Sequence, residues 1–148
     1  MEGKVVSINR SKNKGEVKTP IIEGFFITNF GLEGDGHAEL NSDRQVTFLD
    51  VETIEEMKNS GIYDLKPGMI AENITTSNIK LYDFPVGTKL KVGNVMFEIT
   101  KVGKKCDDSK KCSLKIDIDK CLAKSRIVFA KVLGNGTISK DDRILMLD

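Results

Sequence analysis

The fold is decided by the stretch TKLKVGNVMFEITKV, residues 88–102. Apolar and polar residues alternate on both sides of Gly93-Asn94, a dipeptide that suits a two-residue hairpin turn. The apolar positions that fall on one face of the two arms are Leu90, Val92, Val95, Phe97 and Ile99. The stretch therefore predicts an antiparallel hairpin with one face turned toward a core.

Short apolar or alternating runs occur on either side of this hairpin. The runs expected to form further strands are residues 4–9, 24–29, 45–49 and 143–147. Residues 129–133 and 137–139 flank Gly134-Asn135-Gly136, which predicts a second hairpin. Strands of this number and length are typical of an all-β architecture.

Helical periodicity is confined to one segment, Val51–Asn59, with Asp50 as the expected N-cap and Gly61 as the stop signal. Turn signals recur about every ten residues along the rest of the chain. The sequence therefore predicts a mainly β fold, namely a closed or nearly closed β barrel with one or two short helices. At 148 residues, the chain is expected to form a single domain over residues 1–148.

The composition argues against several classes of partner. Lys and Arg number 23 against 22 Asp and Glu, so the net charge of +1 lacks the basic excess of a nucleic-acid clamp. The lysines, such as Lys58, Lys66 and Lys80, are expected on solvated faces. No apolar run approaches the roughly 18–20 residues of a membrane span, and no signal-peptide pattern opens the chain. We expect a cytoplasmic protein without nucleic-acid or membrane partners.

The first candidate site is a glycine-rich polar segment, Gly31–Ala38, that holds the only histidine of the chain. Gly34 would let a ligand approach the backbone closely, and Asp35 and His37 could face the same ligand. Arg44 precedes a predicted strand and could hold a phosphate bidentately. The alternative is an ordinary turn, in which Asp35 and His37 satisfy local backbone donors and Arg44 forms a surface ion pair.

A second candidate site is the segment Glu72–Thr76, which follows a Pro-Gly turn. The amide of Asn73 and the carboxylate of Glu72 supply the donors and acceptors that the edge of a pterin-like or purine-like ring requires. The alternative is helix capping by Asn73 or Thr75, with Glu72 solvated.

The three cysteines lie within sixteen positions of one another. Cys106 follows Lys104 and Lys105, and neighbouring positive charge favours the thiolate that acts as nucleophile or metal ligand. Cys112 and Cys121 complete a C-x5-C-x8-C spacing, which matches neither the paired zinc pattern nor a ferredoxin pattern. A thiol metal site built from all three cysteines remains an alternative. A second alternative, for Cys112 and Cys121 alone, is that they are buried as small hydrophobic residues.

The order of these segments resembles the MOSC domain, named for the C-terminal domain of molybdenum cofactor sulfurases. The resemblance runs nearly end to end and suggests a short stand-alone member of the family, with a β-barrel fold. It rests on Gly3–Val5, Gly31–Ala38, Arg44–Val46, Pro67-Gly68, Glu72–Thr76, Pro85–Thr88, Val92-Gly93, Gly103-Lys104-x-Cys106 and Phe129–Leu133.

The resemblance implies a ligand, the molybdopterin form of the molybdenum cofactor. The residues it would place around the pterin and its phosphate are Gly34, Asp35, His37, Arg44, Gln45, Glu72, Asn73 and Thr75. It assigns the essential cysteine of the family to Cys106, as a sulfur carrier or as a thiolate ligand to molybdenum. No pyridoxal phosphate is expected on this chain, because there is no room for a sulfurase domain.

Three functions are compatible with this resemblance. The first is sulfur transfer during cofactor maturation, with Cys106 as carrier and with a sulfur donor and molybdoenzymes as partners. The second is molybdenum-dependent reduction of N-hydroxylated compounds, with protons from His37 and electrons from a donor protein. The third is a non-catalytic cofactor-binding or thiol metal-binding module. Asp107 stands where short family members often have a histidine, so the Cys106 segment is the least typical part of the chain.

Overall fold

The computed structural model describes residues 2–62, 64–105 and 121–147, and β-strands make up most of its regular structure. The strands are β1 (Glu2–Arg10), β2 (Thr19–Ile21), β3 (Glu23–Ile27), β4 (Gly31–Leu32), β5 (Val46–Asp50), β6 (Ile74–Ser77), β7 (Lys89–Val92), β8 (Val95–Val102), β9 (Val128–Val132), β10 (Gly136–Ser139) and β11 (Arg143–Leu147). The helical elements are α1 (Val51–Asn59), α2 (Ala123–Arg126) and the 3-10 turn η1 (Leu81–Asp83).

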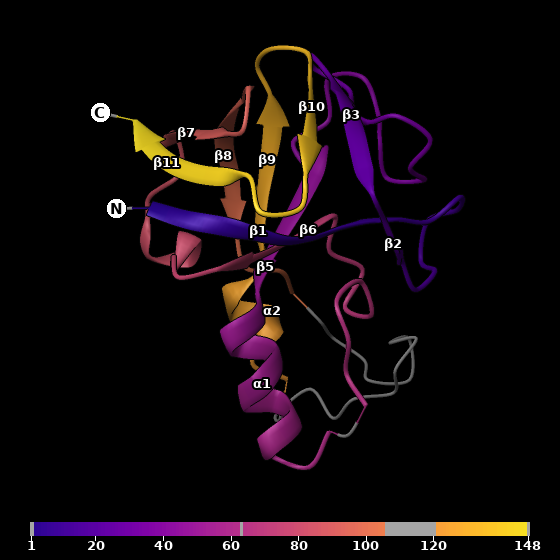
Figure 1. Cartoon of the computed structure of the whole chain (residues 1–148), viewed down its shortest axis with the longest axis vertical. Helices are drawn as coiled ribbons and strands as arrows, with labels where there is room; N and C mark the ends of the chain where they lie inside the picture. The colour runs from indigo at the N-terminus through magenta and orange to yellow at the C-terminus, as the bar shows by residue number, and fades with distance from the viewer. Residues whose placement is uncertain (1, 63, 106–120, 148) are drawn as a thin grey trace.

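Seven strands close a barrel in the order β1-β11-β7-β8-β9-β5-β6, with β6 pairing back to β1. The pairs are antiparallel except for β5 and β6, which run parallel. The last part of β1 also pairs with β2, and a separate small sheet has the order β10-β3-β4. Figure 1 shows α1 and α2 together below the barrel and β3 beside β10 at its upper end. The predicted closed barrel with short helices is confirmed.

The hairpin predicted from residues 88–102 is present as β7 and β8, joined at the pair Val92 and Val95. Its predicted apolar face is buried in the main core. Within that core the ring of Phe97 packs edge-on against Phe48 at 5.2 Å and against Phe26 at 5.7 Å between centroids. The alternation of apolar and polar residues was sufficient to predict this hairpin, because both the turn and the buried face belong to one continuous segment.

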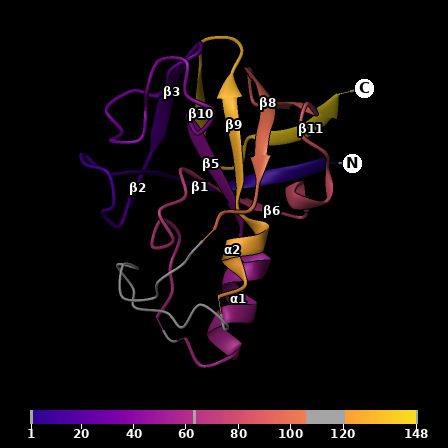
Figure 2. The ribbon, with the colours of Figure 1, turned by 180° about the vertical axis from the view of Figure 1, so that it is seen from behind.

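The second predicted hairpin is wrong. Strands β9 and β10 form close to their predicted positions, but β10 pairs with β3. Both edges of β9 are already occupied, by β5 on one side and by β8 on the other. The turn residues between β9 and β10 therefore lead the chain out of the barrel and into the small sheet (Figure 2).

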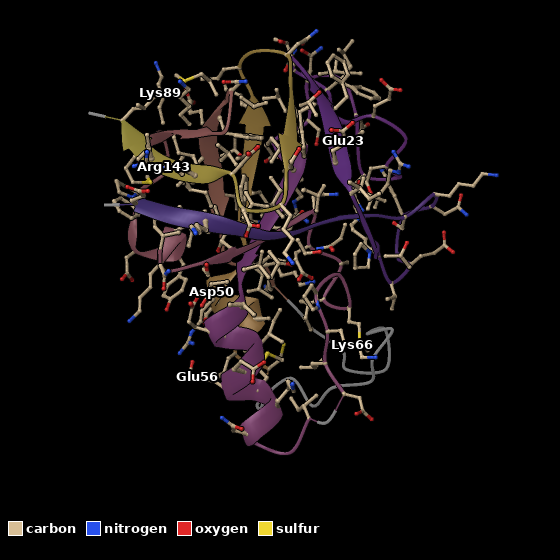
Figure 3. All side chains as sticks on the ribbon, viewed as in Figure 1. Glu23, Asp50, Glu56, Lys66, Lys89 and Arg143 are labelled. Atoms are coloured by element: carbon tan, nitrogen blue, oxygen red, sulfur yellow. The ribbon has the colours of Figure 1, made fainter. Side chains whose placement is uncertain are left out.

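Helix α1 begins and ends as predicted. Asp50 caps it by accepting a hydrogen bond from the backbone N–H of Thr53 at 3.0 Å, and it lies where the barrel meets the helix (Figure 3). Gly61, with φ at +101°, follows the C-terminal cap Ser60. A second apolar cluster packs beneath α1 and includes Ile54 and Met57. Within the described parts of the chain, no helix has the length and apolar character needed to cross a membrane.

Candidate functional site

A fully buried lysine lies at the centre of the candidate site. Lys18 precedes β2, and its side chain is 0% exposed. Its Nζ donates to Oδ1 of Asp35 at 2.7 Å and to Oγ of Ser11 at 3.1 Å, and lies 3.0 Å from Nδ1 of His37. A buried charge requires such partners because its removal from water is otherwise very costly. We refer to Ser11, Lys18, Asp35 and His37 as the Lys18 cluster.

Segments from three parts of the chain position this cluster. Ser11 directly follows β1, Lys18 directly precedes β2, and Asp35 and His37 follow β4. The backbone N–H of Lys18 donates to the carbonyl of Gly68 at 2.9 Å. Gly68 has φ at +92°, and a Cβ there would lie 2.3 Å from the carbonyl oxygen of Lys18. Only glycine at position 68 therefore allows the backbone there to approach Lys18 this closely.

The carboxylate of Asp35 is the counter-ion of Lys18. Besides Nζ of Lys18, it accepts hydrogen bonds from the backbone N–H of Ser11 and from that of His37, each at 3.1 Å. Burial, the largest single effect, raises the pKa of Asp35. The Lys18 ammonium and the Ser11 N–H together outweigh burial and bring this pKa below its ordinary value of 3.8. Asp35 is thus ionised at neutral pH and held in a fixed orientation.

The imidazole of His37 is half-buried, and its pKa is lowered from the ordinary value of 6.5. Burial is the main cause, followed by the positive charge of Lys18, while Asp35 acts in the opposite direction. Lys14 and Lys104 add smaller lowering effects. The ring is therefore neutral near pH 7. Its Nε2 has no hydrogen-bond partner within residues 2–62, 64–105 and 121–147.

The predicted residues Glu72, Asn73 and Thr75 lie in a second buried set between β1 and β6. Oδ1 of Asn73 accepts from the backbone N–H of Thr47 at 3.0 Å, and its Nδ2 donates to the carbonyl of Asn9 at 3.3 Å. Nδ2 of Asn9 donates in turn to Oγ1 of Thr75 at 3.0 Å. We call Asn9, Glu72, Asn73 and Thr75 the β1–β6 polar network. Its side-chain bonds accompany the backbone bonds from the N–H of Asn9 to the Asn73 carbonyl at 2.7 Å and from the N–H of Asn73 to the Thr47 carbonyl at 2.8 Å.

Glu72 is the one ionisable member of this network, and it is 0% exposed. Its Oε2 accepts from the backbone N–H of Gly68 at 3.0 Å and from Oγ1 of Thr75 at 2.8 Å. Its Oε1 is buried without a hydrogen-bond partner in the described residues. Burial, the dominant effect, raises the pKa of Glu72. The alternative in which Glu72 is solvated is wrong, because its side chain is fully buried.

Gln45 and Arg44 are adjacent in sequence but have different environments. Gln45 is fully buried; its Oε1 accepts from the N–H of Val132 at 3.0 Å, and its Nε2 donates to the carbonyl of Ser42 at 2.9 Å. It thereby ties the segment before β5 to the end of β9. Arg44 is exposed, and its guanidinium lies 5.2 Å from the ring centroid of Phe129. No ion pair of Arg44 occurs among the residues that the structure describes.

The structure brings some of the predicted site residues together. Asp35 and His37 share the Lys18 cluster, and the side-chain amide of Asn73 adds a lowering effect on the pKa of Asp35, so the polar network adjoins the cluster. Gly34 is exposed with φ at +82°, next to the side chain of Arg10.

Sequence reasoning missed Lys18, and the expectation that the lysines lie on solvated faces is wrong at this position. Its partners are a residue seven positions before it and residues 17 and 19 positions after it. No periodicity or motif marks such a pairing. The neighbouring Pro20 and the apolar residues of β2 gave the one local hint that this segment returns to the barrel.

Comparison with known proteins identifies the family. The family model of the MOSC domain matches residues 35–145. The chain belongs to the MOSC domain family. The MOSC match includes Asp35 and His37 of the Lys18 cluster and all of the β1–β6 polar network except Asn9. No curated protein matches this MOSC chain in sequence.

Solved structures share the fold of this MOSC domain. The YuaD protein from Bacillus subtilis aligns with a TM-score of 0.77 at 16% identity, over 97% of this chain and 94% of that one. YiiM from Geobacillus stearothermophilus aligns with a TM-score of 0.75 at 18% identity, over 99% of this chain and 75% of that one. YiiM from Escherichia coli aligns with a TM-score of 0.69 at 18% identity, over 100% of this chain and 70% of that one. At these identities the likeness concerns the fold.

MOSC proteins are associated with the molybdenum cofactor, so the donors of this MOSC domain can be compared with what that group needs. An anionic ligand suits His37, because its Nε2 has no hydrogen-bond partner among the described residues and because the positive charges of Lys14 and Lys104 act on its ring. The other predicted contacts fit less directly. Gln45, Glu72, Asn73 and Thr75 are fully buried and are engaged with the protein itself. The residues present therefore fit the cofactor on the His37 side.

Cys106 and Cys112 lie outside the described residues, so their predicted roles remain predictions. The chain leads into that segment from Gly103, whose N–H donates to the carbonyl of Ile127 at 2.7 Å. Lys104 follows, and its charge contributes to lowering the pKa of His37. Cys121 is half-buried against the apolar cluster beneath α1, as in the alternative in which it is a small hydrophobic residue.

Proposed function

We propose that this MOSC domain binds the molybdenum cofactor beside His37 and carries sulfur for its maturation on Cys106. One observation carries the proposal. His37 is held by a fully buried Lys18–Asp35 pair and is influenced by the charge of Lys104, which lies two residues before Cys106. The candidate ligand-binding side chain and the segment leading to the candidate sulfur carrier thus belong to one electrostatic environment.

Arg44 and Gly34 complete the proposed binding surface. Arg44 is exposed above Phe129, and a guanidinium can hold a phosphate bidentately. Gly34 is exposed, and the side chain of Arg10 lies beside it, with Nη1 donating to the carbonyl of Glu33 at 3.1 Å. In this proposal Gln45, Glu72, Asn73 and Thr75 act from behind the surface. They hold the strand ends and the Gly68 segment that position Lys18.

The chemistry proposed for Cys106 is sulfur transfer from a persulfide donor. The Cys106 thiolate attacks the outer sulfur of the donor persulfide, an S–S bond forms on Cys106, and the donor leaves as its own thiolate. Lys101, Lys104 and Lys105 favour the thiolate because positive charge lowers the pKa of a neighbouring thiol. The cofactor, when bound, supplies the molybdenum centre that takes up sulfur.

The first test is chemical analysis of protein purified without oxygen from a molybdate-fed host that makes the cofactor. We expect pterin and molybdenum in equal amounts, and a persulfide on Cys106 after incubation with a persulfide donor. Cys121→Ser is the matched control for Cys106→Ser, because Cys121 packs against the α1 cluster. Loss of the persulfide in Cys106→Ser alone is the expected result. Protein without pterin, or persulfide retained in Cys106→Ser, would contradict the proposal.

A second test concerns binding. Arg44→Ala should weaken cofactor binding by about 1.5–3 kcal/mol, or roughly ten- to hundredfold, if the guanidinium makes a charge-assisted contact. Lys89→Ala is the control, because Lys89 is an exposed cation on β7, where it lies opposite Leu147 of β11 and Glu98 of β8. Equal affinity of the two variants would remove Arg44 from the site. Turnover of N-hydroxylated compounds by loaded protein, without persulfide chemistry, would favour the reductase alternative instead.

A further inference from the structure

The three contacts of Lys18 Nζ define the state of the histidine beside it. An ammonium group has three N–H donors and no acceptor. Two of its contacts are oxygens, Oδ1 of Asp35 and Oγ of Ser11. Ser11 Oγ donates its own hydrogen to the carbonyl of Asn13 at 3.0 Å, so it can only accept from Lys18. The third N–H of the ammonium is then directed at Nδ1 of His37, 3.0 Å away.

A ring nitrogen that accepts a hydrogen bond carries no proton, so the proton of a neutral imidazole is on the other nitrogen. We propose that Lys18 is a positioning residue that fixes His37 as an Nε2–H donor, and that this donor binds an anionic oxygen of the ligand, of the phosphate class. The tautomer assignment stands on the cluster geometry alone. The ligand class deepens the proposed function and rests on it.

The charges that face His37 support an anionic ligand. Lys18 approaches from the segment before β2 and is neutralised by Asp35. Lys14, from the segment between β1 and β2, and Lys104, from the segment after β8, also lower the pKa of the ring. Lys14 is itself paired with Glu39 at 3.8 Å between exposed side chains, whereas no ion pair of Lys104 occurs among the described residues. Lys104 therefore contributes the less screened of the two positive charges that act on the ring. A neutral N–H donor beside such a charge suits an oxyanion.

This assignment separates orientation from proton transfer. The sequence suggested His37 as a source of protons for catalysis. A ring that is neutral near pH 7 and accepts from an ammonium at Nδ1 has no imidazolium proton to give. In the proposal, His37 therefore orients the ligand by a hydrogen bond. Lys18 does not touch the ligand, because its side chain is fully buried.

The direct test is a long-range ¹H–¹⁵N spectrum of the cofactor-free, ¹⁵N-labelled full chain near neutral pH. His37 is the only histidine, so the imidazole signals need no assignment. We expect a pyridine-type Nδ1 and a pyrrole-type Nε2. Free imidazole already prefers this tautomer, so two further observations are decisive. The ¹⁵N chemical shifts of the ring should be those of one tautomer without averaging, and the ring should become protonated only below its ordinary pKa of 6.5. A protonated Nδ1, or averaged shifts, would overturn the proposal.

The variant test uses Lys18→Met, with Lys14→Met as the matched control. Lys18→Met should restore tautomer averaging and raise the pKa of His37 by about one to two units, because it removes a cation and leaves Asp35. Lys14→Met should raise this pKa less and leave the tautomer unchanged. If Lys18→Met does not fold, the double variant Lys18→Met/Asp35→Asn removes both buried charges and should also show averaging. An unchanged tautomer in a folded variant would overturn the role of Lys18.

The ligand class is tested with inorganic phosphate on the same cofactor-free protein at constant pH and ionic strength, with chloride as the control. We expect phosphate to shift the Nε2 signal of the wild type in a saturable way, and Lys14→Met to weaken the effect. No response to phosphate would overturn the anionic-oxygen assignment. Failure of the proposed function is read separately, from the pterin and molybdenum content of protein purified from the cofactor-competent host.

Discussion

Asn73→Ala provides the strongest test of whether the β1–β6 polar network is structural. Removing the amide leaves the buried N–H of Thr47 without an acceptor, which costs about 1–3 kcal/mol, and deletes the bond to the Asn9 carbonyl, worth about 1 kcal/mol. We therefore expect the free energy of unfolding of the cofactor-free protein to fall by about 2–4 kcal/mol. A role limited to binding the cofactor would leave this free energy unchanged.

The assay is urea unfolding followed by far-ultraviolet circular dichroism, with Asn135→Ala as the control. Asn135 is exposed and also makes two hydrogen bonds, accepting from the N–H of Thr28 at 2.6 Å and from its Oγ1 at 2.7 Å. Water can replace these partners, so this control should lose less than about 1 kcal/mol. If the two variants lose the same stability within about 0.5 kcal/mol, burial of the network is not what makes Asn73 important.

Three further predictions concern the elements around the site. Gly68→Ala should lower the free energy of unfolding by more than about 2 kcal/mol, because its Cβ would clash with the Lys18 carbonyl. The control is Gly61→Ala, which has a similar φ but open space around it and should lower the free energy of unfolding by only about 1 kcal/mol. Thermal unfolding of both variants measures the difference. Burial raises the pKa of Glu72, so its contribution to stability is complete below its ordinary pKa of 4.5 and is lost as the pH rises through the folded value. Glu72→Gln should abolish this component as the pH rises above 4.5, and an identical pH profile in both proteins would contradict it. Asp50→Ala should cost about 1–2 kcal/mol in urea unfolding through loss of the α1 cap, and an unchanged midpoint would refute that role.

Local signals were enough for the elements whose partners are close in sequence. The β7–β8 hairpin and helix α1 both form as predicted, because turn, cap and apolar periodicity lie within each segment. The turn after β9 carries an equally clear signal, but its strand pairing depends on which edges other strands occupy. Competition for the edges of β9 by β5 and β8 is a property of the whole barrel, and no local pattern expresses it.

The candidate site divides in the same way. The glycine-rich segment indicated Asp35 and His37, and both contact Lys18, but the ligand that they were expected to share stays a prediction. Lys18 was not predicted, since a buried lysine differs from a solvated one only in the partners that the fold supplies. Burial of Glu72 and Asn73 was missed for a similar reason. The Asn73 side chain bonds to the backbone of Thr47 and Asn9, and polarity alone does not reveal such buried partners. The same holds for Glu72, which accepts from the N–H of Gly68 and from Oγ1 of Thr75.

The closure of the barrel has a consequence for how the chain acquires its structure. β1 pairs with β11, with Glu2 opposite Leu145, so one edge of β1 is covered only by a strand from the other end of the described residues. A fragment that stops short of β11 leaves that edge of the barrel open. Pairings of such sequence separation form slowly. We expect folding in the millisecond-to-second range typical of β barrels, with the ion pair between Arg143 and Glu2 among the last contacts to form.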